Sequence, residues 1–322
     1  MVAAKEPGNK TLGGGIPAVR DRVAQEVVRR LLQPIFEPQF HDCSYGFRPK
    51  RSCHQAIEKV LSFHDDGDRI TLDADIAGFF DNIPHKLIID AVALEVADGN
   101  ILRLVGKFLA AGVMDSGVFT PTTIGTPQGG VISPLLANIV LNKLDWRLEE
   151  AGYRFVRYAD DFVVTCKTRP QAEAALALVE EIMTELGLSL SPEKTKIASY
   201  GKGYEFLGFR LSSKSRTMRS KSLEKFKTKI RELTRRCHNL DAKAIEKLNR
   251  VIRGTANYFA SSFSTCVSLF QKLDKWIRMR IRCMKFKRKS DRDNFRFRQG
   301  SFDKKLGLLK MLAFTNSTMC KT

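Results

Sequence analysis

The pattern of the sequence changes near residue 213, and no other feature constrains the fold as strongly. Before that point, short segments that alternate polar and apolar residues lie between segments with apolar residues at helical spacing. After it, only helical spacing remains, over 222–237, 241–262 and 266–287. We therefore predict a mixed α+β body followed by a helical module, with the boundary in the serine-rich and basic stretch 212–220.

The charge of the chain divides at the same place. Residues 214–322 contain 30 Lys and Arg against 8 Asp and Glu, a net charge of +22, whereas residues 1–213 carry a net charge of −3. Such asymmetry predicts a near-neutral catalytic body joined to a module that binds a polyanion. A solvated basic tail would lack the helical periodicity and aromatic residues of this segment, and a membrane-surface helix would gather its charges on one helix.

Composition excludes several classes of protein. Hydrophobic residues make up 43% of the chain, enough for a core, and no apolar run is long enough to cross a membrane. The first residues contain no apolar stretch that would serve as a secretory signal. The seven cysteines are scattered without a Cys-x-x-Cys pair, which argues against a zinc site and a disulfide framework. We expect a cytoplasmic protein without a membrane partner.

Acidic residues lie at the ends of two predicted strands. Asp75 is near the end of the alternating segment 68–76, and Asp160 and Asp161 occupy the turn of a predicted hairpin over 155–166. The flanking residues are apolar, and carboxylates against apolar walls are costly unless they are paired or bind a metal. Three clustered acids without an obvious basic partner form a hard oxygen site of the kind that Mg²⁺ prefers.

Such a site suits phosphoryl transfer. In two-metal catalysis one ion lowers the pKa of an attacking hydroxyl and the other neutralises the leaving group. Taken singly, each element has an ordinary explanation, because Asp-Asp is common in hairpin turns and Asp75 is equally compatible with a solvated strand end. The catalytic interpretation therefore depends on the whole set of motifs along the chain.

Six motifs follow one another along the sequence: Ser44-Tyr-Gly-Phe-Arg-Pro49, Asp75-Ile-Ala-Gly-Phe-Phe-Asp81, Gly125-Thr-Pro-Gln-Gly-Gly-Val-Ile-Ser-Pro134, Tyr158-Ala-Asp-Asp161, Leu190-Ser-Pro-Glu-Lys-Thr195 and Phe206-Leu-Gly-Phe209. This succession resembles the polymerase motifs of bacterial group II intron reverse transcriptases and covers nearly the whole chain. The segments 248–259 and 273–280 are similar to the thumb, or maturase, domain of that family. No His-Asn-His nuclease segment follows, so we expect the type that lacks the nuclease domain.

The resemblance implies a right-hand polymerase. Fingers and palm, with an antiparallel palm sheet backed by helices, would occupy 1–213, an all-α thumb or maturase domain 214–290, and a short basic tail, as a remnant DNA-binding region, 291–322. The implied function is RNA-directed DNA synthesis, in which a deoxynucleotide is added to a primer 3′-hydroxyl. The alternative is an RNA-binding splicing maturase with weak or no polymerase activity. A role in defence or repair is a third possibility that the residues leave open.

The resemblance also implies a catalytic centre. Asp75, Asp160 and Asp161, with the backbone carbonyl of Ile76, would hold two Mg²⁺ ions, for which Mn²⁺ can substitute. Lys194 would donate a proton to the pyrophosphate leaving group. Lys196 is an equal candidate for that role, and a surface lysine is the ordinary alternative for both.

Ile76 and four further residues are implied in nucleotide binding. Phe80 resembles the aromatic gate that crowds the sugar 2′ position, although a core phenylalanine is the alternative. Gln128 and Gly129 lie in a glycine-rich loop whose backbone can approach a ligand closely, and a turn with a solvated amide is the alternative. In the family, a basic fingers strand precedes the Ile-Pro pair that corresponds to Ile16-Pro17. In this chain only two lysines of that strand remain, and Lys10 is one of them.

Nucleic acid is the expected partner of a larger group of residues. Arg48 and Arg157 either contact the nucleic-acid backbone or form salt bridges with nearby acids. The other candidates are Tyr158 in the body and, in the helical module, Arg253, Arg278, Arg280, Arg282 and Lys285. The expected partners are an RNA template, a DNA primer, deoxynucleotides and a structured group II intron RNA, in a ribonucleoprotein or at the nucleoid.

Overall fold

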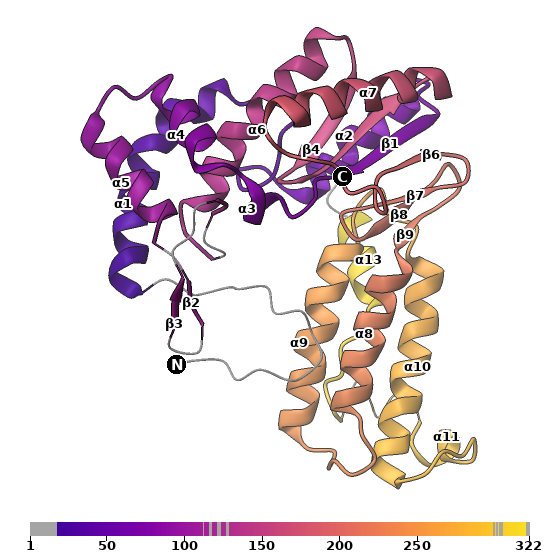
Figure 1. Cartoon of the computed structure of the whole chain (residues 1–322). Helices are drawn as coiled ribbons and strands as arrows, with labels where there is room; N and C mark the ends of the chain where they lie inside the picture. The colour runs from indigo at the N-terminus through magenta and orange to yellow at the C-terminus, as the bar shows by residue number, and fades with distance from the viewer. Residues whose placement is uncertain are drawn as a thin grey trace. The chain divides into compact units, whose positions relative to one another are not determined.

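The structure is a computed structural model that describes residues 18–111, 113–115, 118–120, 124–126, 129–298, 300, 302 and 305–319. The chain forms two compact units, Met1–Ser199 and Tyr200–Thr322 (Figure 1). Lys10 and Gln128, both expected to bind nucleotide, lie outside the described residues.

A four-stranded antiparallel sheet forms the centre of the first unit. Its strands are β1 (Ile70–Asp75), β4 (Arg154–Tyr158), β5 (Asp161–Cys166) and β6 (Lys196–Ser199), in the order β4-β5-β1-β6. β5 follows β4 through a two-residue turn, since Tyr158 and Asp161 are opposite each other. The β1 strand is therefore central, with β5 on one side and β6 on the other.

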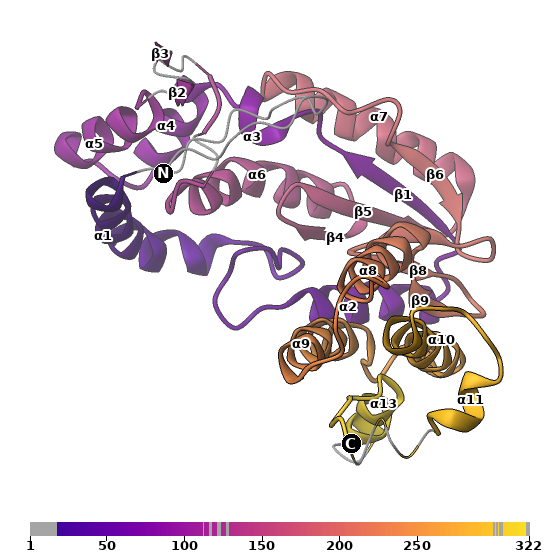
Figure 2. The same ribbon diagram turned by 90° about the horizontal axis from the view of Figure 1, so that it is seen from below.

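Helices surround this sheet. The unit contains α1 (Val19–Phe36), η1 (Glu37–Gln39), α2 (Cys53–Asp65), α3 (Phe79–Asn82), α4 (His85–Ala93), α5 (Gly99–Leu109), α6 (Ser133–Glu150), α7 (Arg169–Glu185) and a hairpin of β2 (Val113–Asp115) and β3 (Val118–Thr120). Contacts to the sheet come from α2, α6 and α7, whereas α4 packs between α5 and α6 (Figure 2).

Local sequence explains where several helices begin. Ser52 and Gln55 form a capping box at the start of α2, in which each side chain bonds to the other residue's backbone N–H. Asp98 and Thr168 accept backbone N–H groups at the starts of α5 and α7. The α6 helix is different, because most of its residues are buried on all sides, as in a helix that crosses the core.

The second unit combines a small sheet with long helices. The strands β7 (Tyr204–Phe206), β8 (Phe209–Leu211) and β9 (Arg216–Met218) are antiparallel and adjacent in chain order. The helices α8 (Ser220–Leu233), α9 (Ala242–Phe259) and α10 (Val267–Phe286) lie side by side in Figures 1 and 2. The short α11 (Asp293–Arg296) and α13 (Leu312–Met319) pack against α10.

The expected antiparallel palm sheet and helical module are confirmed. The β2–β3 hairpin and β9 were not predicted, and the units separate after Ser199, before the predicted boundary. The two units divide earlier in the sequence than predicted because β7 and β8 pack against helices of the second unit. Tyr258 Oη donates to the Leu207 carbonyl at 2.7 Å, and the Phe209 ring lies 4.8 Å from that of Phe259.

Among the described residues, no helix is both long and apolar enough to span a bilayer.

The central strand should dominate the stability of the first unit. Leu72 in β1 is fully buried, so Leu72→Ala should lower the free energy of unfolding by about 2–5 kcal/mol, through lost burial and a cavity. Leu94 is 83% exposed, so Leu94→Ala should change it by less than about 0.5 kcal/mol. Chemical denaturation of the full chain checks both values, and equal effects of the two substitutions would contradict the structure.

Candidate active site

The pairing of β1 with β5 brings two of the predicted carboxylates together. Asp75, the last residue of β1, lies directly opposite Asp161, the first residue of β5. Opposite residues of an antiparallel pair point to the same face, with Cβ atoms about 4.5–5.5 Å apart. Asp160 precedes Asp161 in the β4–β5 turn, so all three acids lie at one end of the sheet.

The electrostatics of Asp160 indicate a crowded carboxylate site. Burial raises the pKa of Asp160, and the negative charge of Asp75 raises it further, while Lys194 and Arg157 act in the opposite direction. Gathering these acids is costly without a compensating cation.

Lys194 supplies such a cation in this structure. Its Nζ lies 2.8 Å from Asp75 Oδ2, and this hydrogen bond raises the pKa of Lys194. The loop that carries it is bound to the same strand end, because the Ser191 N–H donates to the Asp75 carbonyl at 2.8 Å. Lys196, the equal candidate from sequence, lies instead in β6 opposite Asp73.

The donor set fits divalent cations by its chemistry, since three carboxylates are hard oxygen ligands. Within the described part of the chain, however, no three His, Cys, Asp or Glu side chains are already arranged to hold a metal ion. The ion pair with Lys194 engages one oxygen of the Asp75 carboxylate, Oδ2.

The predicted nucleotide-binding segments are joined by backbone contacts. The Thr126 N–H donates to the Phe80 carbonyl at 2.6 Å, and a Cβ on Gly125 would lie 2.6 Å from the Asp81 carbonyl oxygen. Phe79 is buried and Phe80 is half-buried beside it, with ring centroids 5.3 Å apart. Phe79 is therefore a core residue, and Phe80 has the partial exposure that a gate residue needs.

The structure corrects the expected nucleic-acid contacts of two arginines. Arg157 has no exposed surface and forms a salt bridge with Asp145. Arg48 is also buried; its Nε donates to Glu37 at 2.9 Å and its Nη1 donates to the His41 and Ser44 carbonyls. Both adopt the salt-bridge alternative, because a buried guanidinium with protein partners cannot reach a phosphate.

Comparison with known proteins identifies the family of this chain. The family described as reverse transcriptase (RNA-dependent DNA polymerase) matches residues 4–211. The chain belongs to the reverse transcriptase family. The group II intron maturase-specific domain matches residues 223–300, so this reverse transcriptase is of the group II intron type.

Two curated relatives illustrate the likeness. Protein YkfC of Escherichia coli (strain K12) is 37% identical over 239 residues, 62% of this chain and 63% of that protein. Group II intron-encoded protein LtrA of Lactococcus lactis subsp. cremoris is 45% identical over 157 residues, 49% of this chain and 26% of that protein. This chain thus spans less than two thirds of the length of either relative.

A solved structure supports the fold alone. The apo telomerase from Candida tropicalis aligns over 94% of this chain and 55% of its own, with a TM-score of 0.50 and 11% sequence identity. The antiparallel sheet and the helical unit of this reverse transcriptase are consistent with that architecture.

The expected nucleic-acid residues of the second unit have different surroundings. Arg280 joins α10 to the end of α8, since its Nε donates to Thr234 Oγ1 and its Nη2 to the Thr234 carbonyl, both at 3.1 Å. Arg278 and Arg282 line a cavity of about 340 Å³ beside α11. Arg253 and Lys285 are exposed.

In the first unit, Tyr158 is half-buried, and its ring centroid lies 6.5 Å from that of the exposed Phe47. Gly129 is exposed and has a φ of 84°. Both remain candidates for contact with ligands.

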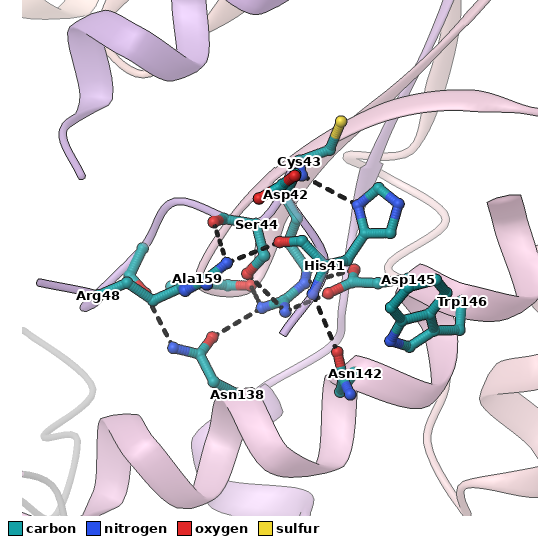
Figure 3. A network of polar contacts seen from close by, with 12 residues as sticks. His41, Asp42, Cys43, Ser44, Arg48, Asn138, Asn142, Asp145, Trp146 and Ala159 are labelled. Carbon is teal, nitrogen blue, oxygen red and sulfur yellow. Dashed lines mark hydrogen bonds and ion pairs between the residues drawn. The ribbon is translucent and has the colours of Figure 1, made fainter. Parts of the chain in front are cut away.

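Three residues near the catalytic turn were missed by the sequence analysis. Gly46, Asn138 and Asp145 belong to a polar network around Arg157, part of which Figure 3 shows. A signal was present, because Asn138 and Asp145 are seven residues apart and share one face of α6, among buried residues that are mostly apolar. Polar residues at helical spacing on the buried face of a helix indicate that they have buried hydrogen-bonding partners.

Neutralising Asp160 should stabilise the metal-free protein. Because burial raises the pKa of Asp160, its ionised form opposes folding, so Asp160→Asn should melt at a higher temperature than wild type at neutral pH in EDTA. The difference should shrink as the pH falls, because the buried wild-type carboxyl takes up its proton at a higher pH than a free aspartate does.

Thermal melting curves between pH 4 and 8 check this expectation. Substitution of the exposed Asp90 by Asn is the control and should show no comparable gain. A wild-type protein more stable than Asp160→Asn at neutral pH would contradict it.

Proposed function

We propose that this reverse transcriptase is an active RNA-directed DNA polymerase, which adds deoxynucleotides to a primer 3′-hydroxyl on an RNA template. The observation that supports this most directly is the position of Asp75 opposite Asp161, with Asp160 in the adjoining turn. An active centre of this type needs acids from separate chain segments at one point, and β1 and the β4–β5 turn supply them.

In this proposal, two Mg²⁺ ions would activate the primer hydroxyl and neutralise the leaving pyrophosphate. Asp75, Asp160, Asp161 and the Ile76 carbonyl would be their ligands. Lys194 then has two positions: on Asp75, as in the structure, and on the pyrophosphate once Asp75 binds an ion. A protonated Lys194 beside the departing phosphate is suited to give it a proton.

The proposal also assigns the nucleotide-binding residues and the domain boundaries. Phe80 would crowd the sugar 2′ position, with Gln128, Gly129 and Lys10 at the nucleotide. Fingers and palm would occupy 1–213, the thumb or maturase domain 214–290 and a basic tail 291–322. The matched family segments, 4–211 and 223–300, support the division near residue 213.

Primer extension tests the activity. On poly(rA)/oligo(dT) with Mg²⁺, wild type should incorporate dTTP, and Asp160→Ala should lose about 1000-fold in rate, because several kcal/mol of charge stabilisation are removed. Substitution of the exposed Asp90 by Ala should leave the rate unchanged. Incorporation that survives Asp160→Ala would refute the assignment of the active centre.

A second candidate function is RNA binding as a splicing maturase, with or without polymerisation. The match of residues 223–300 to the maturase-specific domain and the net charge of +22 over 214–322 support it. One relative, 24% identical over 233 residues, is named nuclear intron maturase 2, mitochondrial, of Arabidopsis thaliana. The partner would be a structured group II intron RNA in a cytoplasmic or nucleoid-associated ribonucleoprotein.

The basic cavity beside α11 offers a test of this second function. Replacing Arg278 and Arg282 by Gln should lower the slope of log affinity against log salt concentration by about 1–2, since each bound phosphate contributes about 0.7–0.9. The control removes two exposed charges from α5, at Arg103 and Lys107. Fluorescence anisotropy of a short labelled RNA hairpin measures both.

Equal slopes for the two double variants would show that the cavity takes no special part in RNA binding. RNA binding without primer extension in the wild type would favour the maturase function over the polymerase.

A further inference from the structure

We infer that Arg157 is a positioning residue, which holds the turn bearing Asp160 and Asp161 in the conformation that the catalytic centre requires. The kinetic part of this inference rests on the proposed polymerase function, whereas the geometric part stands by itself. Arg157 lies in β4, two residues before Ala159, and its side chain is fully buried. A residue in that place acts on the turn and not on the substrate.

Every N–H group of the Arg157 guanidinium has an acceptor. Asp145 accepts from Nε at 2.7 Å and also from Nη2, which forms a two-pronged salt bridge. Ser44 Oγ accepts the second Nη2 hydrogen at 2.8 Å. Asn138 Oδ1 and the Ala159 carbonyl oxygen accept from Nη1 at 2.8 and 3.0 Å. Five donors are the full capacity of an arginine, and a lysine with three donors cannot reproduce this fork.

The contact with Ala159 is the one that bears on catalysis. Ala159 is the first residue of the two-residue turn and has a φ of 60°, which costs a residue with a Cβ about 1–2 kcal/mol. Such a conformation persists only where the surroundings impose it. The Arg157 N–H group bound to the Ala159 carbonyl imposes it from one side, directly before Asp160.

Gly46 closes the turn from the other side. A Cβ at Gly46 would lie 2.2 Å from the Ala159 nitrogen and 2.8 Å from the Tyr158 carbonyl carbon. The Asn138 amide donates to the Gly46 carbonyl at 2.8 Å, so the residue that receives Arg157 also holds Gly46. The backbone of Arg157 is bonded to this segment as well, donating to the Cys43 carbonyl at 2.9 Å and accepting from the Tyr45 N–H at 2.8 Å.

Stability alone does not explain this arrangement. Two fully buried charges, Arg157 and Asp145, carry a desolvation cost that their attraction seldom exceeds, and apolar residues of similar volume often do as well or better. A buried ion pair is better suited to fixing one conformation than to stabilising a core. Here the conformation that it fixes carries two of the three catalytic acids.

The test is the double variant Arg157→Met/Asp145→Leu, which removes both charges together, so that neither is left buried without the other. Ser44 Oγ, Asn138 Oδ1 and the Ala159 carbonyl each lose one donor in this variant. The matched control is Thr165→Val/Asp68→Leu, a buried polar pair 2.7 Å apart at the other end of β5. We expect both variants to melt below wild type, and their activities are compared at a temperature at which both are folded. In primer extension, kcat of the first should fall about 100-fold with KM for dTTP little changed, because misplacement of catalytic groups acts on the chemical step.

Two further variants perturb the turn in different ways. Arg157→Lys keeps the charge but loses the fork, so a positioning role predicts a loss of kcat close to that of the double variant. Gly46→Ala leaves the ion pair intact and presses a Cβ against Ala159, so it should lower kcat in the same way. Retention of wild-type kcat by all three variants would overturn the inference.

A readout without turnover separates this inference from the polymerase function. Titration of the full chain with Mn²⁺, followed by electron paramagnetic resonance, should show about 10–100-fold weaker binding in Arg157→Met/Asp145→Leu and no change in the Thr165/Asp68 control. If the wild type binds Mn²⁺ but does not extend primers, the polymerase proposal fails while this comparison still decides the role of Arg157. Equal Mn²⁺ affinity of the two double variants would overturn that role.

Discussion

The antiparallel pairing of β1 with β5 is the constraint on which the rest of the site depends. It sets Asp75 opposite Asp161, although the two residues are far apart in the sequence. Because the side-chain period of a strand is two, a slip of one residue would turn Asp75 to the other face of the sheet and remove it from the other acids. Leu72 and Val164 are fully buried and lie opposite each other, so a slip would break up this packed pair.

Neighbouring elements then complete what the pairing begins. The loop that carries Lys194 is bound to the end of β1 and neutralises Asp75, while the Arg157 network ties the β4–β5 turn to α6 and to the segment around Gly46. A buried polar network thus supports the turn that carries Asp160 and Asp161, and Lys194 pairs with Asp75. In the proposed mechanism, the network would keep the turn in place and Lys194 would give up Asp75 to a metal ion.

Sequence reasoning reached the main features because they have a regular period or an ordered set of motifs. Alternation over 68–76 and 155–166 predicted the strands that carry Asp75 and Asp160, and the motif order predicted the family. Three-residue strands such as β9 are too short for a period to show. For Arg157 the sequence left two alternatives, contact with nucleic acid or a salt bridge. Its partners Asn138 and Asp145 lie on a helix, and no local pattern specifies how that helix packs against β4.

The proposed mechanism requires Asp75, Asp160 and Asp161 to share divalent ions. Anomalous diffraction from crystals of the full chain with Mn²⁺, a primer–template and a non-reactive deoxynucleotide analogue measures this directly. We expect two Mn²⁺ peaks roughly 3.5–4 Å apart, bound by Asp75 and by the β4–β5 turn, with Lys194 released from Asp75. Mn²⁺ bound elsewhere, or Asp75 still paired with Lys194 and without an ion, would contradict it.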